Sequence, residues 1–131
     1  WPDCIPGLTR LETKYLLGTL SNGSIIGLSS MAKRARLPWN FIFSSDVFKA
    51  YKRDAAVYQG AIELLGLKPN QIMLVAAHND DLNAARSHGM LTAYINRPYE
   101  YGIDQTCDFN AEENWEVIAH SMEGLADIMD V

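Results

Sequence analysis

The sequence predicts an α/β fold in which a parallel sheet is flanked by helices, built as a single domain over residues 1–131. Three observations predict it. Short apolar segments alternate with amphipathic helical patterns along the whole chain. Residues 72–77, IMLVAA, form a continuous apolar run, which is typical of a parallel strand covered on both faces. A chain of this length can also bury roughly two thirds of its unfolded surface in one core.

The elements of the first half follow from where apolar residues recur and where helix-capping residues stand. Pro6 and Gly7 precede a short amphipathic pattern, and Ser24 and Asp54 precede two longer ones. Gly66 follows the last of these helices, where a glycine commonly ends one. We therefore expect, in chain order, a helix at 8–14, a strand at 15–20, a helix at 24–35, a strand at 41–44, a helical turn at 46–50 and a helix at 55–65.

The second half repeats the alternation after a loop at residues 68–71, where proline and asparagine interrupt the apolar pattern. Gly89 closes a helix that starts with acidic residues, as the helix dipole favours. In chain order we expect a strand at 72–77, a helix at 80–88, a strand at 91–95, a short strand near 115–118 and a final helix at 121–129.

The composition limits the partners. Eleven basic against sixteen acidic residues give a net charge of −5, which argues against nucleic acid as a partner because phosphate binding needs a basic face. No apolar stretch approaches the ~20 residues of a membrane span, and no segment resembles a signal peptide. Cys4 and Cys107 lack the spacing of zinc or redox motifs, so we expect two reduced thiols in the core. We expect a cytoplasmic protein without a membrane partner.

Three polar loops lie at or beside the ends of predicted strands: residues 20–23 (LSNG), 51–54 (YKRD) and 78–81 (HNDD). In a parallel sheet such loops can converge at one edge, where ligands bind. Each loop also has a plain structural explanation: a turn, a solvated basic pair, and acidic residues at a helix start. The order and spacing of all three together indicate a site.

The whole set resembles the haloacid dehalogenase (HAD) superfamily, and within it the type II 2-haloacid dehalogenase branch. The strand ending in Ser-Asn-Gly, the lysine stretch before a Val-Tyr helix, and the apolar strand leading to an acidic residue are all similar to motifs of that family. They stand here at 20–23, 51–58 and 73–81, followed by Ala85-Arg86 and Gly89, by 93–98 (AYINRP) and by 100–102 (EYG). The resemblance implies a Rossmann-like (HAD-like) fold and hydrolysis of a small-molecule 2-haloacid without cofactor or metal.

The resemblance also implies roles for individual residues. In such enzymes an aspartate displaces halide from carbon and forms an ester that water then hydrolyses. Lys52 would keep that aspartate ionised and Asp81 would anchor the lysine and orient water. Ser21 would bind the substrate carboxylate and Asn22 would receive the halide. Two further side chains, Tyr58 and His78, would face the substrate.

Three departures from the family pattern stand near these residues. Ala76-Ala77 occupies the place where phosphatase branches carry a magnesium-binding aspartate. Alanine offers no oxygen ligand, so the alternative of a HAD-type phosphatase is disfavoured. Arg53 follows Lys52 where the family commonly has proline, which predicts a looser loop. His78 stands where some dehalogenases have asparagine.

The largest departure concerns the nucleophile. Members of the family carry the nucleophilic aspartate in an N-terminal Asp-x-x-Gly-Thr segment, and no such segment occurs in the chain. We expect a chain lacking the N-terminal nucleophile strand and the cap, the C-terminal portion of a HAD-like core, inactive alone. Its start at Trp1 without an initiator Met fits a fragment. The resemblance implies that the lost strand would lie between those ending at Leu20 and Ala77. Without it, either these two strands pair directly or a gap exposes apolar edges and favours a homo-oligomer. A noncatalytic binding or assembly module remains the other alternative.

Overall fold

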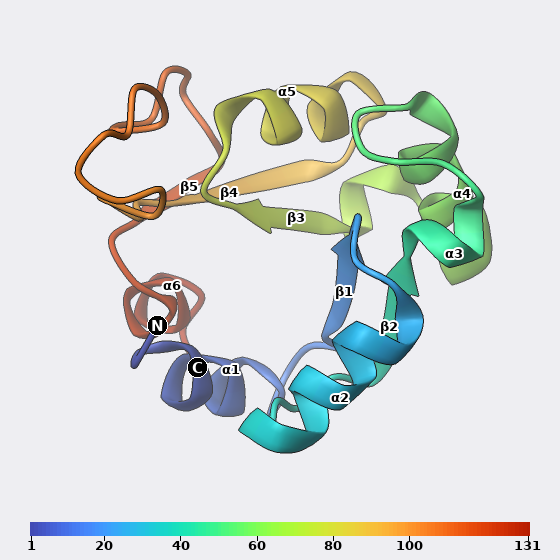
Figure 1. Ribbon diagram of the computed structural model, residues 1–131, viewed down its shortest axis with the longest axis horizontal. Coiled ribbons are helices and arrows are strands. Elements are labelled where there is room, and N and C mark those ends of the chain that lie inside the picture. The colour runs from blue at the N-terminus through green and yellow to red at the C-terminus, as the bar shows by residue number, and fades with distance from the viewer.

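The computed structural model describes all 131 residues and contains two parallel sheets (Figure 1). The strands are β1 (Gly18–Ser21), β2 (Phe41–Ser44), β3 (Met73–Ala76), β4 (Leu91–Ile95) and β5 (Val117–Ala119). One sheet has the order β1–β2 and the other β3–β4–β5, and every pairing is parallel. The α/β class and the parallel arrangement expected from the sequence are confirmed.

The helices begin where capping side chains satisfy free backbone N–H groups. Ser24, Asp54 and Ser121 each accept a hydrogen bond from an N–H in the first turn of the helix that follows. Gly66 ends a helix with a φ of 63°, a conformation that glycine adopts without strain. The helices are α1 (Cys4–Leu11), α2 (Ile25–Ala35), α3 (Ser45–Phe48), α4 (Ala55–Leu65), the 3-10 turn η1 (Pro69–Gln71), α5 (Asn79–Ser87) and α6 (Met122–Ile128).

Helix α1 differs most from the sequence prediction, because it starts at Cys4 instead of residue 8. Pro6 is compatible with the earlier start, since an N–H in the first helical turn has no partner to lose. Gly7 packs against α6 so closely that a Cβ there would lie 2.4 Å from the backbone carbon of Met122. The two residues that look like a helix boundary are therefore inside the helix, where they allow this contact.

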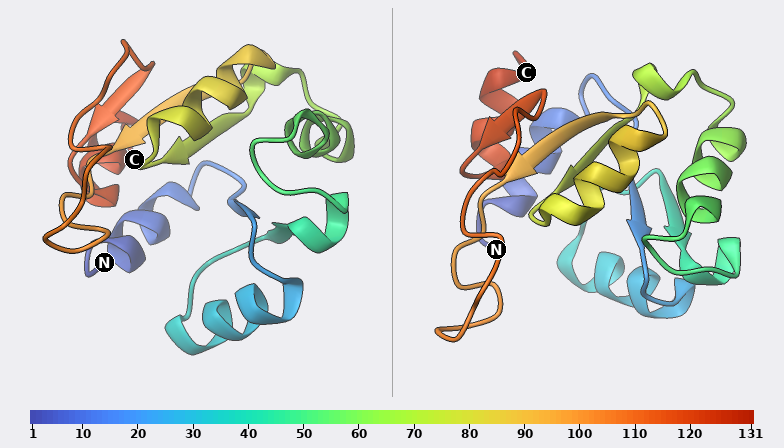
Figure 2. Two further views of the ribbon diagram at one scale, coloured as in Figure 1. Left: turned by 45° about the horizontal axis from the view of Figure 1, so that its top comes forward. Right: turned by 90° about the horizontal axis from the view of Figure 1, so that it is seen from above.

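Strand β4 is covered on both faces, because successive side chains of a strand point to opposite sides. Tyr94 belongs to a core cluster that includes residues of α4 and α5. Ala93 and Ile95 belong to a second cluster with residues of α1 and α6. Figure 2 shows α5 on one side of the three-stranded sheet and α1 with α6 on the other. Most of the core of the molecule therefore surrounds β4.

Strands β1 and β3 do not pair with each other, and each has one edge without a neighbouring strand. Of the two outcomes left open by the sequence, the structure therefore has the gap. The consequence is uneven burial: α2 has no buried residue, and Val75 of β3 is 38% exposed. The expectation that residues 72–77 are covered on both faces is wrong at Val75, because no element packs over that side chain.

The termini meet at the side of the molecule where α1 and α6 lie together (Figure 1). Asp3 links three segments there, since one carboxylate oxygen accepts hydrogen bonds from Arg97 and from the backbone N–H of Met122, each at 2.7 Å. Cys4 and Cys107 are free thiols, but the expected core position is wrong, because Cys4 is only half-buried and Cys107 is exposed. None of the helices is both long and apolar enough to cross a membrane.

Candidate active site

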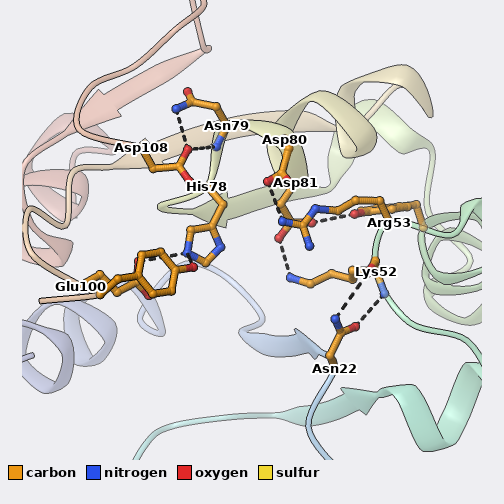
Figure 3. A network of polar contacts seen from close by, with 11 residues as sticks. Asn22, Lys52, Arg53, His78, Asn79, Asp80, Asp81, Glu100 and Asp108 are labelled. Carbon is orange, nitrogen blue, oxygen red and sulfur yellow. Dashed lines mark hydrogen bonds and ion pairs between the residues drawn. The ribbon is translucent and has the colours of Figure 1, made fainter. Parts of the chain in front are cut away.

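The three polar loops expected from the sequence come together where the two sheets approach each other. Asn22 follows β1, Lys52 lies in the loop between α3 and α4, and Asp81 lies in the first turn of α5, just after β3. Figure 3 shows these side chains in sequence from β1 to α5, joined by dashed contacts. The polar network therefore connects the two-stranded sheet to the three-stranded one.

Lys52 and Asp81 form an ion pair at the centre of this network, with the carboxylate buried and the lysine partly buried. The Lys52 Nζ lies 2.5 Å from Asp81 Oδ2, and the two side chains are 16% and 1% exposed. The hydroxyl of Tyr58 donates to the other carboxylate oxygen of Asp81 at 2.6 Å. Both oxygens of the buried carboxylate therefore have donors, as a buried charge requires.

Tyr58 is fully buried in α4, with its hydroxyl directed at Asp81. Burial raises the pKa of Tyr58 far above its ordinary value, and the hydrogen bond to Asp81 and the charge of Asp81 add to the rise. The hydroxyl is thus held as a proton donor to Asp81. The position implied by the resemblance, facing the site from the helix, is where the structure places it, but its contact is with Asp81.

Asn22 holds the backbone of Lys52 from both sides. Its Oδ1 accepts the Lys52 N–H at 2.6 Å, and its Nδ2 donates to the Lys52 carbonyl at 3.4 Å. Ser21 instead stabilises the local turn, since its Oγ accepts the Gly23 N–H at 3.1 Å. The segment LSNG is therefore both a turn and part of the polar network, with the two functions divided between neighbouring residues.

A second ion pair lies next to the first. Arg53 contacts Asp80 at 2.6 Å, with the two side chains 39% and 63% exposed. Burial alone would raise the pKa of Asp80, but the hydrogen bond and the charge of Arg53 leave that pKa below its ordinary value. The Lys52–Arg53 peptide bond is cis. Arg53, which replaces the proline common in the family, thus adds a contact between this loop and α5.

His78 lies beside the Lys52–Asp81 pair without contacting it. Its Nε2 is 3.0 Å from Glu100 Oε2 and 2.8 Å from the hydroxyl of Tyr101, and the imidazole stacks on the Tyr101 ring. Glu100 and Tyr101 belong to a segment that resembles the family, but the resemblance implies no role for either residue. Their contact with His78 spans more than twenty residues, and no local pattern predicts it.

Asn79 lies in one of the three polar loops, but no role was predicted for this residue. It is 2% exposed, its amide donates to Asp108 and to the carbonyl of Asn110, and its Oδ1 accepts from Trp115 Nε1 at 3.1 Å. All its polar atoms therefore have partners in the segment after β4, which it fixes beside α5. An asparagine before two aspartates at a helix start resembles an ordinary cap, so sequence alone gives little sign of this role.

Of the predicted site residues, the structure thus brings four into one network: Asn22, Lys52, Tyr58 and Asp81. Ser21 and His78 lie at its margin and bond to other groups. No group of three or more histidine, cysteine, aspartate or glutamate side chains is placed to hold a metal ion. The arrangement offers one lysine ammonium, anchored on its inner side by a carboxylate, at the ends of parallel strands.

Comparison with known proteins gives closely related sequences and structures, while no family model matches the chain. The chain is 35% identical over 134 residues to (S)-2-haloacid dehalogenase 4A of Burkholderia cepacia, an alignment that covers 96% of this chain and 58% of that protein. The crystal structure of L-2-haloacid dehalogenase PA0810 superimposes with a TM-score of 0.97 at 44% identity, covering 99% of this chain and 56% of that one.

A defluorinating L-2-haloacid dehalogenase, Rha0230, gives a TM-score of 0.96 at 43% identity, over 100% of this chain and 54% of that one. The chain therefore spans a little over half the length of these relatives. Both the sequence and the fold agree along nearly all of the chain. Residues 1–131 belong to the haloacid dehalogenase superfamily, in the branch of the L-2-haloacid dehalogenases.

Proposed function

We propose that the complete protein hydrolyses a short 2-haloalkanoic acid to the 2-hydroxy acid and halide, through an ester on an aspartate that lies outside residues 1–131. The observation that carries the proposal is the anchored ammonium of Lys52, together with the dehalogenase names of the relatives. In this proposal, residues 1–131 supply the positive charge and the lysine anchor, and have no turnover alone.

Lys52 has the chemistry that the reaction needs. An ammonium has three N–H donors, and only one of them is used within the chain, by Asp81. Two donors remain for anions, and the reaction has two carboxylates to stabilise: the attacking aspartate and the acid group of the substrate. The anchor on Asp81 fixes the direction of the lysine before substrate binds, so little reorganisation is needed.

The aspartates of this network are unsuited to be the nucleophile. Asp81 is 1% exposed in its side chain, and both its oxygens accept hydrogen bonds. Asp80 is paired with Arg53 on the exposed side of α5. Since both oxygens of Asp81 are occupied and Asp80 is paired with Arg53, we place the nucleophile on another segment. The free edges of β1 and β3 fit one parallel strand between them. Without that strand, these edges favour association of copies of the chain.

Halide release by the complete protein tests the proposal. With 2-chloropropionate and no added metal, we expect stoichiometric release of chloride and 2-hydroxy acid, abolished by Lys52→Met. The matched control is Arg53→Met, which removes the neighbouring exposed cation and leaves Lys52 in place. Magnesium-dependent hydrolysis of p-nitrophenyl phosphate without halide release would make the protein a phosphatase. Absence of both activities would make the fold a noncatalytic module.

A further inference from the structure

The cluster of His78, Glu100 and Tyr101 is built from two separate segments and is not used by the proposed chemistry of Lys52. His78 stands directly before α5, and the other two residues stand in the turn after β4. Both of their contacts are made to the same imidazole nitrogen, Nε2. The other nitrogen, Nδ1, has no hydrogen-bond partner in the chain. In Figure 3 it faces the side where Lys52 and Asp81 lie.

The carboxylate of Glu100 decides which nitrogen of the neutral imidazole carries the proton. An ionised carboxylate only accepts hydrogen bonds, so at 3.0 Å it needs a proton on Nε2. A lone pair on Nε2 would instead face the negative oxygen. Burial raises the pKa of Tyr101, and the charge of Glu100 adds to the rise, so the phenol remains a neutral partner. The neutral ring is therefore the Nε2–H form, with the lone pair on Nδ1.

We propose that His78 is the general base that activates water for hydrolysis of the ester intermediate, and that Glu100 and Tyr101 position its imidazole. This inference rests on the proposed function. The Nδ1 atom takes a proton from water as the water oxygen bonds to the ester carbonyl carbon. The bond from that carbon to the alkyl oxygen then breaks, the alkyl oxygen takes up the proton from His78 to become the hydroxyl of the product, and the aspartate carboxyl is regenerated.

The charged groups around the imidazole are compatible with this role. Glu100 and Tyr101 face the imidazole from the turn after β4. The Asp80 carboxylate, which is paired with Arg53, interacts electrostatically with the imidazole from α5. The positive charge of Lys52 is paired with the carboxylate of Asp81. The His78 side chain is 27% exposed, so water reaches it. If the contact only tied the turn to α5, His78→Gln would leave the rate of ester hydrolysis unchanged, whereas the base role predicts a slower rate.

The tautomer can be measured on residues 1–131 without any activity. Imidazole ¹⁵N shifts should show neutral His78 as the Nε2–H form. His88 serves as an internal reference for the opposite form, because its Nδ1 lies 2.8 Å from the Ala84 carbonyl and must donate. Glu100→Ala should convert His78 to a mixture of both forms, and Glu100→Gln should restore the Nε2–H form by supplying an acceptor oxygen. A His78 that carries its proton on Nδ1, or does not respond to Glu100→Ala, would overturn the positioning role.

The base is tested in the complete protein with 2-chloropropionate. For His78→Gln, we expect halide release in the first turnover to continue, while ester hydrolysis slows by about 10²–10⁴-fold. The ester should then accumulate as a covalent mass increase on the protein. Glu100→Ala should show the same accumulation to a smaller degree, with Glu100→Gln intermediate. Glu113→Ala, which removes an exposed carboxylate further along the same region, is the matched control and should behave as wild type.

The outcomes separate this inference from the proposed function. If the wild-type protein neither releases halide nor forms an ester, both the proposed function and the role of His78 as a base are wrong. The ¹⁵N measurement still tests whether Glu100 positions the imidazole. If His78→Gln releases halide normally and no ester accumulates, the role of His78 as a base is wrong, while the proposed function stands. A raised KM at unchanged kcat would assign His78 to substrate binding and overturn the proposal.

Discussion

Two ion pairs on adjacent residues show how burial determines the contribution of an ion pair to the stability of the fold. Lys52 and Arg53 are neighbours, as are Asp81 and Asp80, and both pairs join the same loop to the same helix. The first pair lies almost out of water and the second is largely solvated. Removing one partner of a buried pair leaves an uncompensated charge, whereas solvent screens an exposed pair.

We therefore predict that Lys52→Met lowers the free energy of unfolding by about 3–5 kcal/mol, because it leaves the Asp81 carboxylate buried without its cation. Arg53→Met should cost only about 0–1 kcal/mol. Urea titration of residues 1–131 followed by circular dichroism measures both. Equal losses in the two variants would contradict the assignment of Lys52–Asp81 as the buried pair.

The raised pKa of Tyr58 predicts a loss of stability in alkali. Above the ordinary value of 10.0, the unfolded chain releases the phenolic proton while the folded chain, through burial and Asp81, keeps it. The unfolded state then binds fewer protons, so stability falls as pH rises beyond about 10. Tyr58→Phe should unfold at lower urea concentration at neutral pH, yet lose less stability than wild type between pH 10 and 11. Parallel pH profiles of the two proteins would rule out this linkage.

At the residue scale, the sequence predicted Lys52, Asp81 and Asn22 as members of one site because each belongs to a local motif with a recognisable order. It could not predict the contact of His78 with Glu100, or the burial of Asn79, because these depend on how the segment after β4 folds back on α5. Short motifs carry the chemistry of the site, while its support comes from long-range packing.

At the scale of elements, the pairing of α1 with α6 depends on a glycine. A Cβ at Gly7 would lie 2.4 Å from the carbon and 2.6 Å from the oxygen of the Met122 backbone, atoms that cannot move without shifting α6. Glycine inside a helix is otherwise unfavourable by about 1 kcal/mol relative to alanine. Packing and helix propensity therefore oppose each other at this position.

We predict that Gly7→Ala destabilises the chain by about 1–3 kcal/mol, because overpacking outweighs the gain in helix propensity. Gly27→Ala in α2 is the control, since a Cβ there would meet only the Ser24 hydroxyl, at 3.1 Å. The control should change stability little or raise it. Thermal unfolding of both variants decides the matter, and stabilisation by Gly7→Ala would show that α1 and α6 are not in close contact.

The elements were predictable to the extent that their limits are local. The bounds of β2, β4 and α4 agree with the sequence prediction, because capping residues and apolar runs define them. Helices α2 and α6 each start one residue later than predicted, because Ser24 and Ser121 are their N-caps. The start of α1 was wrong because the breakers Pro6 and Gly7 are accommodated by the first helical turn and by the approach of α6. Tertiary packing overrode local propensity at this point.

At the scale of the whole molecule, the two sheets are buried to different extents. The three-stranded sheet has core clusters on both faces, whereas α2 beside the two-stranded sheet has no buried residue. The sequence left open whether β1 and β3 pair, because strand pairing between distant segments is not encoded in either strand alone. The ion pairs Lys52–Asp81 and Arg53–Asp80, and not a strand ladder, connect the two parts at the site.

This arrangement predicts association of residues 1–131 in solution through the exposed strand edges. Sedimentation velocity at increasing concentration should show species larger than a monomer. Val75→Lys, at a 38% exposed position of β3, should shift the distribution toward monomer. Ile128→Lys, at a 55% exposed position of α6, is the control and should leave association unchanged. A monomer at all concentrations would mean that the edges are protected.

The unpaired edges of β1 and β3 have a further consequence, because they allow the catalytic groups to be divided between two polypeptide chains. If the attacking carboxylate enters on a strand of its own, ammonium and nucleophile can be encoded by two genes and meet only when their products do. Fused to two other proteins, such halves would form a sensor whose signal, free halide, reports that those proteins have come together.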